Sequence, residues 1–307
     1  MRVLLSGALC ALSTFAASQP VRETLTQAIA AGGQRIVQFR HGYLVALPNG
    51  PAYSFDTFAP DGRLAFDKAI ELPGGGSQSS IGDVDFDTDG TAVVAASAIG
   101  GTPCMLHGVL ILDRTGRQIR FIDTGCYIPT HIAFAPDHSI WTLGWQRDVS
   151  GTEEDRQDYM IIRQFTIDGK QVSAALPRSS FPKGLGPGSA GDELHIEVTR
   201  DRVGVLVYSG NTSLNREWIE LDLNGRIIKR LRIDSVVRSP ASVAFTADDH
   251  VYLQGADKGT LFTIDTVLHA LKPVPSQGAS LMGADDNNLV YRQACCGLIQ
   301  LQWFHQP

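Results

Sequence analysis

Short apolar runs separated by tight-turn sequences are the main pattern of this 307-residue chain. The stretch from Ile81 to Asp123 shows it best, with four apolar runs at 84–86, 92–96, 109–112 and 119–122. Asp-Thr-Asp-Gly separates the first two runs and Asp-Arg-Thr-Gly the last two, and both are turn sequences. The pattern predicts a four-stranded antiparallel meander over residues 81–123.

Degraded copies of this unit recur along the chain. Aligning the first strand of each copy gives six equivalent positions, which are Ile36, Asp83, His131, His195, Ser242 and Ser280. Four of the five gaps between successive positions lie between 38 and 48 residues, and loop insertions at 148–157 and 178–192 fill the fifth, of 64 residues. A period in the forties indicates blade-like units that bury their faces only by stacking on neighbours.

The last copy has three strands instead of four, and the alternating run Val21–Ile29 supplies a spare strand at the other end of the chain. Pairing the two ends would close a ring and remove an open sheet edge. We therefore predict an all-β, six-bladed β-propeller whose last blade is closed by the N-terminal strand. The alternative is a two-sheet sandwich, which should alternate apolar and polar residues. Middle strands such as Val203–Tyr208 are apolar on both faces, which favours the propeller.

Composition fits an exported globular domain. Hydrophobic residues make up 43% of the chain and charged residues 19%, enough for a packed core. The net charge of -6, without a basic run, disfavours nucleic acid as a partner. Residues 1–18 have the pattern of a signal peptide, which leaves 19–307 as a single propeller domain in the periplasm or outside the cell. No other stretch is long and apolar enough to span a membrane.

Four cysteines follow the signal, namely Cys104, Cys126, Cys295 and Cys296. An even number in an exported chain indicates disulfides, and four cysteines allow three connectivities. Cys104 and Cys126 flank two strands of one blade, and we expect a bridge between them. The adjacent pair Cys295-Cys296 would form a vicinal disulfide, stay reduced or exchange with the other pair.

Two recurring motifs carry a resemblance to a known family. They are the Phe-x-x-Asp-Gly turn, as at Phe86–Gly90, and Leu-Asp-x-x-Gly-Arg, as at Leu112–Arg117 and Leu221–Arg226. They resemble the six-bladed NHL/SMP-30-type propeller superfamily, over nearly all of the mature chain. The resemblance implies a six-bladed ring and a range of roles that includes sugar lactonases, a zinc-dependent amidating lyase and binding modules. The Glu-Gly-Pro metal motif of the lactonase branch is absent here.

Three residues form a candidate metal site. Asp83, His131 and His195 occupy one register on the innermost strands of three consecutive blades, so they should face the same central channel. Two imidazoles and a carboxylate can hold a divalent metal such as zinc, iron or calcium. Glu193 and Glu197 are candidate further ligands or hydrogen-bond partners. The alternative is that these polar residues are solvated or hydrogen-bonded across blades.

The leading functional hypothesis is an exported binding module that presents its loop-rich face to a protein, peptide or small ligand. Long loops held by a rigid scaffold commonly carry binding residues, and the longest here are 146–159 and 178–192. We expect a monomer. The alternative is a metal-dependent lyase or hydrolase with its metal at the mouth of the channel, and a third option is a structural ring in a larger assembly. The sequence leaves open whether the protein is an enzyme.

Overall fold

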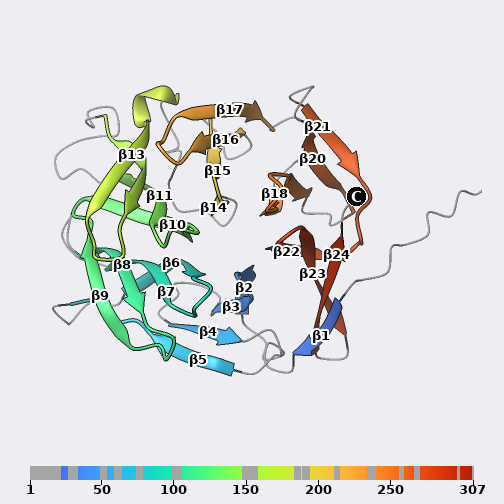
Figure 1. Cartoon of the computed structure of the whole chain (residues 1–307), viewed down its shortest axis with the longest axis horizontal. Coiled ribbons are helices and arrows are strands. Elements are labelled where there is room, and N and C mark those ends of the chain that lie inside the picture. Colours follow the sequence, from blue (N-terminus) through green and yellow to red (C-terminus); the bar gives the residue numbers. More distant parts are fainter. Residues whose placement is uncertain are drawn as a thin grey trace, which may run out of the picture.

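The predicted propeller is present. The computed structural model describes residues 22–26, 34–48, 54–58, 64–73, 79–98, 106–146, 158–182, 188, 194–210, 215–233, 240–255, 259–265, 270–295 and 298–305. These residues form six four-stranded antiparallel sheets, arranged as blades around a central axis (Figure 1). The arrangement confirms the all-β, six-bladed propeller.

The innermost strand, next to the axis, is the first strand along the chain in blades 1 to 5 and β22 in blade 6 (Figure 1). Blade 1 consists of β2 (Gln34–Arg40), β3 (Tyr43–Pro48), β4 (Ser54–Phe58) and β5 (Leu64–Ala69). Blade 2 consists of β6 (Ser79–Phe86), β7 (Ala92–Ala98), β8 (His107–Leu112) and β9 (Gln118–Asp123). Blade 3 consists of β10 (Tyr127–Phe134), β11 (Ile140–Gln146), β12 (Met160–Phe165) and β13 (Gln171–Pro177). Blade 4 consists of β14 (His195–Val198), β15 (Arg202–Tyr208), β16 (Arg216–Asp222) and β17 (Ile227–Arg232). Blade 5 consists of β18 (Pro240–Phe245), β19 (Val251–Gly255), β20 (Leu261–Asp265) and β21 (Ala270–Val274). Blade 6 consists of β22 (Ser280–Asp285), β23 (Asn288–Cys295), β24 (Leu298–His305) and β1 (Arg22–Thr26).

The two ends of the chain close the ring. Strand β1 pairs antiparallel with β24, with Arg22 opposite Trp303 and Thr26 opposite Ile299. Blade 6 therefore contains three C-terminal strands and one N-terminal strand. This confirms the predicted closure. The predicted strand 21–29 is described only over 22–26.

The core lies between blades, as expected when middle strands are apolar on both faces. Every residue of β8 is buried, and so are the first five residues of β7. One hydrophobic cluster joins Val93 and Val109 of blade 2 to Ile132 and Phe134 of blade 3. Both faces of these sheets are thus covered, which rules out the sandwich alternative. At Gly82 the blades come so close that a Cβ atom would lie 2.6 Å from the carbonyl oxygen of Thr130.

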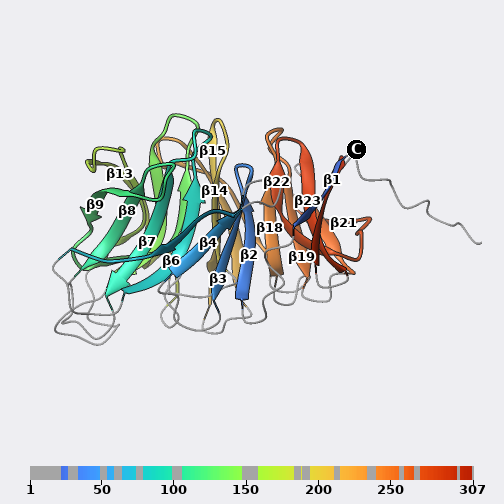
Figure 2. The same ribbon diagram turned by 90° about the horizontal axis from the view of Figure 1, so that it is seen from below.

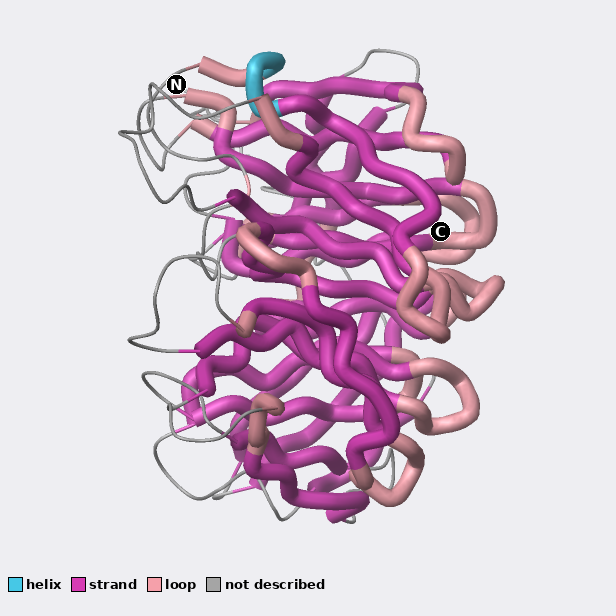
Figure 3. The backbone as a smooth tube through the Cα atoms, turned by 90° about the vertical axis from the view of Figure 1, so that its left-hand side faces the viewer, coloured by secondary structure: helices cyan, strands magenta, loops and turns pink. Residues whose placement is uncertain are grey.

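Tight turns gather at one end of the blades, which we call the turn face (Figures 2 and 3). The turn after β6 is an example, because the Gly90 amide donates to the Asp87 carbonyl at 3.0 Å and Gly90 has a φ of +87°. Aspartate and glycine fit such turns because Asp accepts hydrogen bonds from nearby amides and Gly adopts positive φ freely. One 3₁₀ turn, η3 (Arg178–Ser180), follows β13. Among the described residues, no helix has the length and hydropathy to cross a membrane.

Candidate functional site

Charged side chains from blades 1, 2 and 4 meet inside the ring. We call them the hub cluster, and its members are Arg40, His41, Asp83, Asp85 and Glu197. The strands that carry them, β2, β6 and β14, all border the central axis (Figure 1). Because Arg40, Asp85 and Glu197 stand at or next to the last residue of their strands, the cluster lies toward the turn face of the channel.

Arg40 connects the three blades. Its side chain is buried, with Nη2 3.6 Å from Oδ2 of Asp83 and Nη1 3.4 Å from Oε1 of Glu197. Burial lowers the pKa of Arg40, but the charges of Asp83, Asp85 and Glu197 outweigh it and raise this pKa above its ordinary value. Both separations exceed the roughly 2.7–2.9 Å of a good charge-assisted hydrogen bond. The guanidinium therefore faces the carboxylates of Asp83 and Glu197 from two other blades.

Each hub carboxylate also joins its own blade to the next one. Asp83 Oδ2 accepts from the Ile132 amide at 3.1 Å, and Asp85 Oδ2 from the Phe134 amide at 2.6 Å. Glu197 Oε2 accepts from the Phe245 amide at 2.7 Å. Acceptor and donor are 48 or 49 residues apart, about one repeat of the blade. This bears out, for Asp83, the alternative that polar channel residues are hydrogen-bonded across blades.

The other carboxylate oxygens of Asp85 and Glu197 contact side chains at the hub. Asp85 Oδ1 is enclosed, lacks a hydrogen bond within the described part of the chain, and lies 3.3 Å from Nδ1 of His41. Glu197 Oε1 lies 2.9 Å from Nε2 of His195 as well as 3.4 Å from Arg40. Burial raises the pKa of Asp85, but the charges of His41 and Arg40 and the Phe134 amide outweigh it and lower this pKa overall. Asp85 therefore stays ionised.

His41 stands where the hub meets the surface. It occupies the two-residue turn between β2 and β3 with a φ of +44°, and 41% of its side chain is exposed. The nearby carboxylate of Asp85 raises the pKa of His41 to about 9, with a smaller contribution from Glu197 and against burial and the charge of Arg40. His41 is therefore a cation at neutral pH.

A cavity lies beside these charges. Its volume is about 60 Å³, and it is lined by Phe39, Arg40, His41, Asp85, Ala133, Glu197, Val198, Phe245 and Ala284. A water molecule occupies roughly 30 Å³ of liquid, so the cavity has room for a small polar group. Ala133 occupies in blade 3 the register position that Asp85 occupies in blade 2, since each precedes the residue that forms the last pair with the next strand. The short side chain leaves space opposite the carboxylates.

The structure divides the residues of the predicted metal site. Asp83 lies in the hub, and His195 is close enough for its charge to act on the pKa of Asp83, which burial raises and Arg40 lowers. His131 is buried, and its Nδ1 lies 3.0 Å from Oγ1 of Thr130. Within the described ranges, no three or more His, Cys, Asp or Glu side chains are placed to hold a metal. Glu193 lies outside the described residues, and the metal site stays a prediction.

Sequence reasoning named Glu197 only as an auxiliary residue and missed Arg40, His41 and Asp85. A signal for Asp85 was present, because residues two apart on a strand point to the same face. Asp85 follows Asp83 by two positions, as Glu197 follows His195. The alignment that selected Asp83 and His195 thus also pointed to Asp85 and Glu197, two residues further along the same strands.

Most of the predicted loop-rich face lies outside the described residues, including 147–157 and 183–187. Two aromatic residues beside its longest loop are described. Tyr159 is buried in the cluster between blades 3 and 4, and Trp145 is half-buried against it. Both therefore pack between blades.

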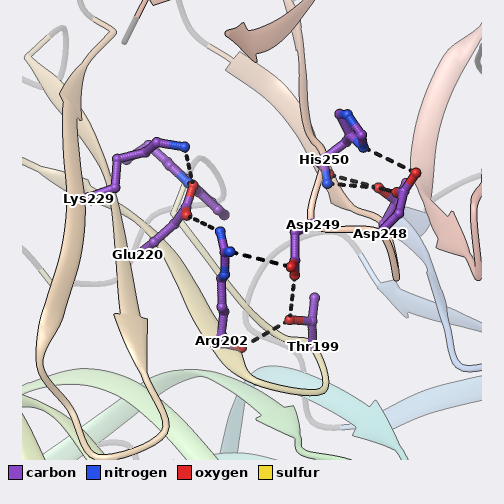
Figure 4. Close-up of polar contacts among 9 residues, drawn as sticks. Thr199, Arg202, Glu220, Lys229, Asp248, Asp249 and His250 are labelled. Carbon is purple, nitrogen blue, oxygen red and sulfur yellow. Dashed lines mark hydrogen bonds and ion pairs between the residues drawn. The ribbon is translucent and has the colours of Figure 1, made fainter. Parts of the chain in front are cut away.

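A second cluster of charges joins blades 4 and 5, and Figure 4 shows it. We call it the rim cluster, and its members are Arg202, Glu220, Lys229 and Asp249. Buried Glu220 lies 3.2 Å from both Arg202 Nη1 and Lys229 Nζ and also accepts from Trp218 Nε1 at 3.0 Å. Arg202 Nη2 lies 3.5 Å from Asp249 Oδ2 across the blade boundary. Two cations face two carboxylates in this cluster, and each member has a close partner.

Comparisons with known proteins agree with this architecture. A protein of unknown function from Bacteroides caccae has a TM-score of 0.52 and 14% identity, covering 84% of this chain and 82% of that one. Inactive H270A virginiamycin B lyase from Staphylococcus aureus, with quinupristin, has a TM-score of 0.53 and 13% identity, covering 88% and 80%. The PQQ-bound aldose sugar dehydrogenase from Streptomyces coelicolor has a TM-score of 0.52 and 14% identity, covering 94% and 100%.

These likenesses show the fold alone, because all three identities are low. No protein-family description matches the sequence, and no curated protein matches it at significant similarity. The sheets, the closure and the structural neighbours define the chain as a six-bladed β-propeller. This confirms the six-bladed propeller fold that the sequence motifs imply.

Proposed function

We propose that this propeller is a ligand-binding module that holds a small charged or polar group in the hub cavity. The observation that carries the proposal is the enclosed space of about 60 Å³ walled by Arg40, His41, Asp85 and Glu197. A cavity with a few convergent polar groups and shifted pKa values is the usual mark of a binding site. One oxygen of Asp85 and one of Glu197 accept backbone amides of the next blade, and the other oxygen of each faces the side chains of the hub beside the cavity.

The proposed site lies at the turn face, whereas the sequence hypothesis places binding on the loop-rich face. We retain export as part of the proposal, supported by the signal-like pattern of residues 1–18. A periplasmic or extracellular location would expose the channel mouth to small solutes. Measuring the N-terminal residue of protein recovered from the producing cells tests this part, with cleavage near residue 18 expected.

A plugged cavity tests the proposed function. Ala284 lines the cavity, and we expect Ala284→Leu to fill it at a cost of about 1–3 kcal/mol in stability. Saturable stabilisation of the native protein by small charged or polar solutes, measured by thermal melting, should disappear in this variant. Ala247→Leu is the matched control, because Ala247 is exposed in the turn after β18. Solutes that stabilise both variants equally, or no stabilising solute at all, would overturn the proposal.

The metal-dependent lyase or hydrolase stays an alternative with its own test. Metal analysis of the purified mature protein should find stoichiometric zinc, iron or calcium if Asp83, His131 and His195 bind it. The double variant His131→Ala/His195→Ala should then lose the metal. Protein that takes up no metal even after soaking would remove this alternative.

We also propose the bridge between Cys104 and Cys126. Cys126 is disulfide-bonded, while Cys104 lies outside the described residues. Peptide mapping without reduction should recover the two cysteines in one cross-linked fragment. A fragment that joins Cys126 to Cys295 or Cys296 would contradict the pairing.

A further inference from the structure

Strand β17 forms the outer edge of blade 4, on the outside of the ring and away from the hub cluster (Figure 1). It pairs with β16, and within the described residues no second strand pairs with it. Its outer side therefore offers backbone N–H and C=O groups with which an added strand can pair. An interaction at this edge would be separate from the proposed function of the cavity.

Two exposed isoleucines mark the edge. Ile227 is 49% exposed and Ile228 is 52% exposed. Ile228 is the extra residue of a β-bulge, with Ile227 and Lys229 paired to β16 on either side of it. Bulges commonly redirect side chains at sheet edges. Adjacent exposed aliphatic side chains on a free strand edge favour contact with another polypeptide.

The charged side chains of β17 are all cations, namely Lys229, Arg230 and Arg232. Lys229 Nζ lies 3.2 Å from Oε1 of Glu220, and Arg230 Nη2 lies 2.8 Å from Oε2 of Glu217. Both carboxylates are buried on β16, whereas Arg230 and Arg232 are exposed. The compensating negative charges thus lie behind the strand, and the groups of the edge that face solvent are positive.

Blade 3 helps to hold this edge in place. The guanidinium of Arg230 lies over the ring of Phe181, 5.0 Å from its centroid, and its Nη2 donates to the Ser180 carbonyl at 3.5 Å. A strand that is fixed before binding loses less conformational freedom when a partner docks.

The outer strands of the other blades are less suited to an added strand. Proline occurs in β13 and β21, and acidic and basic residues are mixed in β1, β5 and β9. Proline and mixed charge both oppose pairing at an edge. Among the outer strands, β17 alone combines three cations with no carboxylate and no proline.

The sign of the charge also decides which partner fits. Two copies of β17 paired with each other would place cations opposite cations, which disfavours a second copy of this chain. We infer that the outer edge of β17 binds an extended acidic segment of another polypeptide, which adds a fifth strand to blade 4. The carboxylates of this segment would meet the exposed arginines, and its aliphatic side chains would pack on Ile227 and Ile228.

The first part of the test uses the full chain and a labelled peptide of alternating Glu and Val, roughly eight residues long, which is a common strand length. Fluorescence anisotropy compares it with the matching Lys-Val peptide and with a Glu-Val peptide methylated at every backbone nitrogen. We expect saturable binding of the unmodified Glu-Val peptide only, because the methylated one donates no backbone hydrogen bonds. Equal binding of the methylated peptide, or no binding of Glu-Val up to about 1 mM, would overturn the inference.

The second part locates the binding. Arg226→Glu/Arg232→Glu reverses two exposed charges at the ends of β17, and we expect a loss of Glu-Val affinity of about tenfold or more. Arg114→Glu/Lys170→Glu reverses two exposed charges in the corresponding turns of blades 2 and 3 and should leave the affinity nearly unchanged. Circular dichroism checks folding, and Ile228→Asp is the second edge variant if the first does not fold. Equal losses in the edge variant and the control would show binding by overall charge and overturn the inference.

Two further measurements identify other occupants. Sedimentation with vesicles of phosphatidylglycerol and phosphatidylcholine tests a membrane surface, and analytical ultracentrifugation tests a second copy. We expect a monomer, and no vesicle binding that depends on the β17 edge. Vesicle binding or a dimer that is lost in Arg226→Glu/Arg232→Glu would assign the edge to that occupant and overturn the acidic segment.

Discussion

The hub cluster and the rim cluster both gather charged side chains, but in different surroundings. Both place carboxylates and cations at a boundary between blades. In the rim cluster, Glu220 has two cations at 3.2 Å and an indole N–H at 3.0 Å. In the hub cluster, Arg40 Nη1 lies 3.4 Å from Glu197 and Nη2 3.6 Å from Asp83, beside a cavity of about 60 Å³. The comparison teaches that similar charge pairs can have different surroundings: the rim cluster joins blades 4 and 5, whereas the hub cluster also borders a cavity, which makes it the candidate binding site.

The largest effect is expected from removing the central cation of the hub. Arg40→Met leaves buried Asp83 and Asp85 and half-buried Glu197 without their shared partner, and breaking a buried ion pair costs about 3–5 kcal/mol. The loss should be greatest above pH 7 and smaller near pH 5, because the unpaired carboxylates then bind protons. Urea unfolding at several pH values measures it. A loss that does not change with pH would show that Arg40 acts through packing alone.

The next effect concerns the rim, where Glu220→Gln leaves Arg202 and Lys229 facing a neutral amide. We expect the free energy of unfolding to fall by about 2–3 kcal/mol, because both cations lose their buried counter-charge. Urea unfolding at pH 7 gives the value. Little change from pH 5 to pH 8 should accompany it, since neither Arg nor Lys titrates there. A change below about 0.5 kcal/mol would mean that the rim cluster is not the joint described here.

The same substitution in the hub should cost less. Glu197→Gln removes one carboxylate charge from a half-buried position, and we expect a change within about 1 kcal/mol of wild type, since the hydrogen bond from the Phe245 amide is kept. Parallel urea titrations of Glu197→Gln and Glu220→Gln provide the direct comparison. Equal losses in both variants would remove the distinction between the clusters.

The smallest effect is expected from His41→Asn, because asparagine tolerates the positive φ and removes the charge. The pKa of His41 is raised to about 9 by Asp85, so the ion pair stabilises the fold fully below pH 6.5 and loses this effect as the pH rises through 9. We expect His41→Asn to lower the free energy of unfolding by about 1 kcal/mol, or Tm by about 2 °C. The effect is small because solvent screens the exposed imidazole beside Arg40, Asp85 and Glu197. Melting both proteins between pH 6 and pH 10 should show the difference vanish at the alkaline end. A constant difference would contradict the assignment.

The fold followed from the sequence because repeated local signals agree with one another. Turn motifs such as Phe86–Gly90 separate apolar runs of matching length, and the spare N-terminal strand completes the last blade. The candidate site was harder to predict. Register placed Asp83 and His195 in the channel, yet Arg40 lies beyond the aligned position, at the end of a strand with a two-residue turn. Charge balance and the space left by Ala133 depend on distances across three blades, which spacing along the chain does not contain.

The pairing of β1 with β24 has a consequence for the timing of folding. Residues 22–26 are made first, whereas their partners at 299–303 are made almost last. A ribosome-bound chain can stack its early blades, but it cannot pair β1 with β24 until residue 303 has been released. Removing residues 298–307, which include all of β24, would therefore strip β1 and β23 of their hydrogen bonds to it at once, and the damage would reach β1 as well as the C-terminal strands.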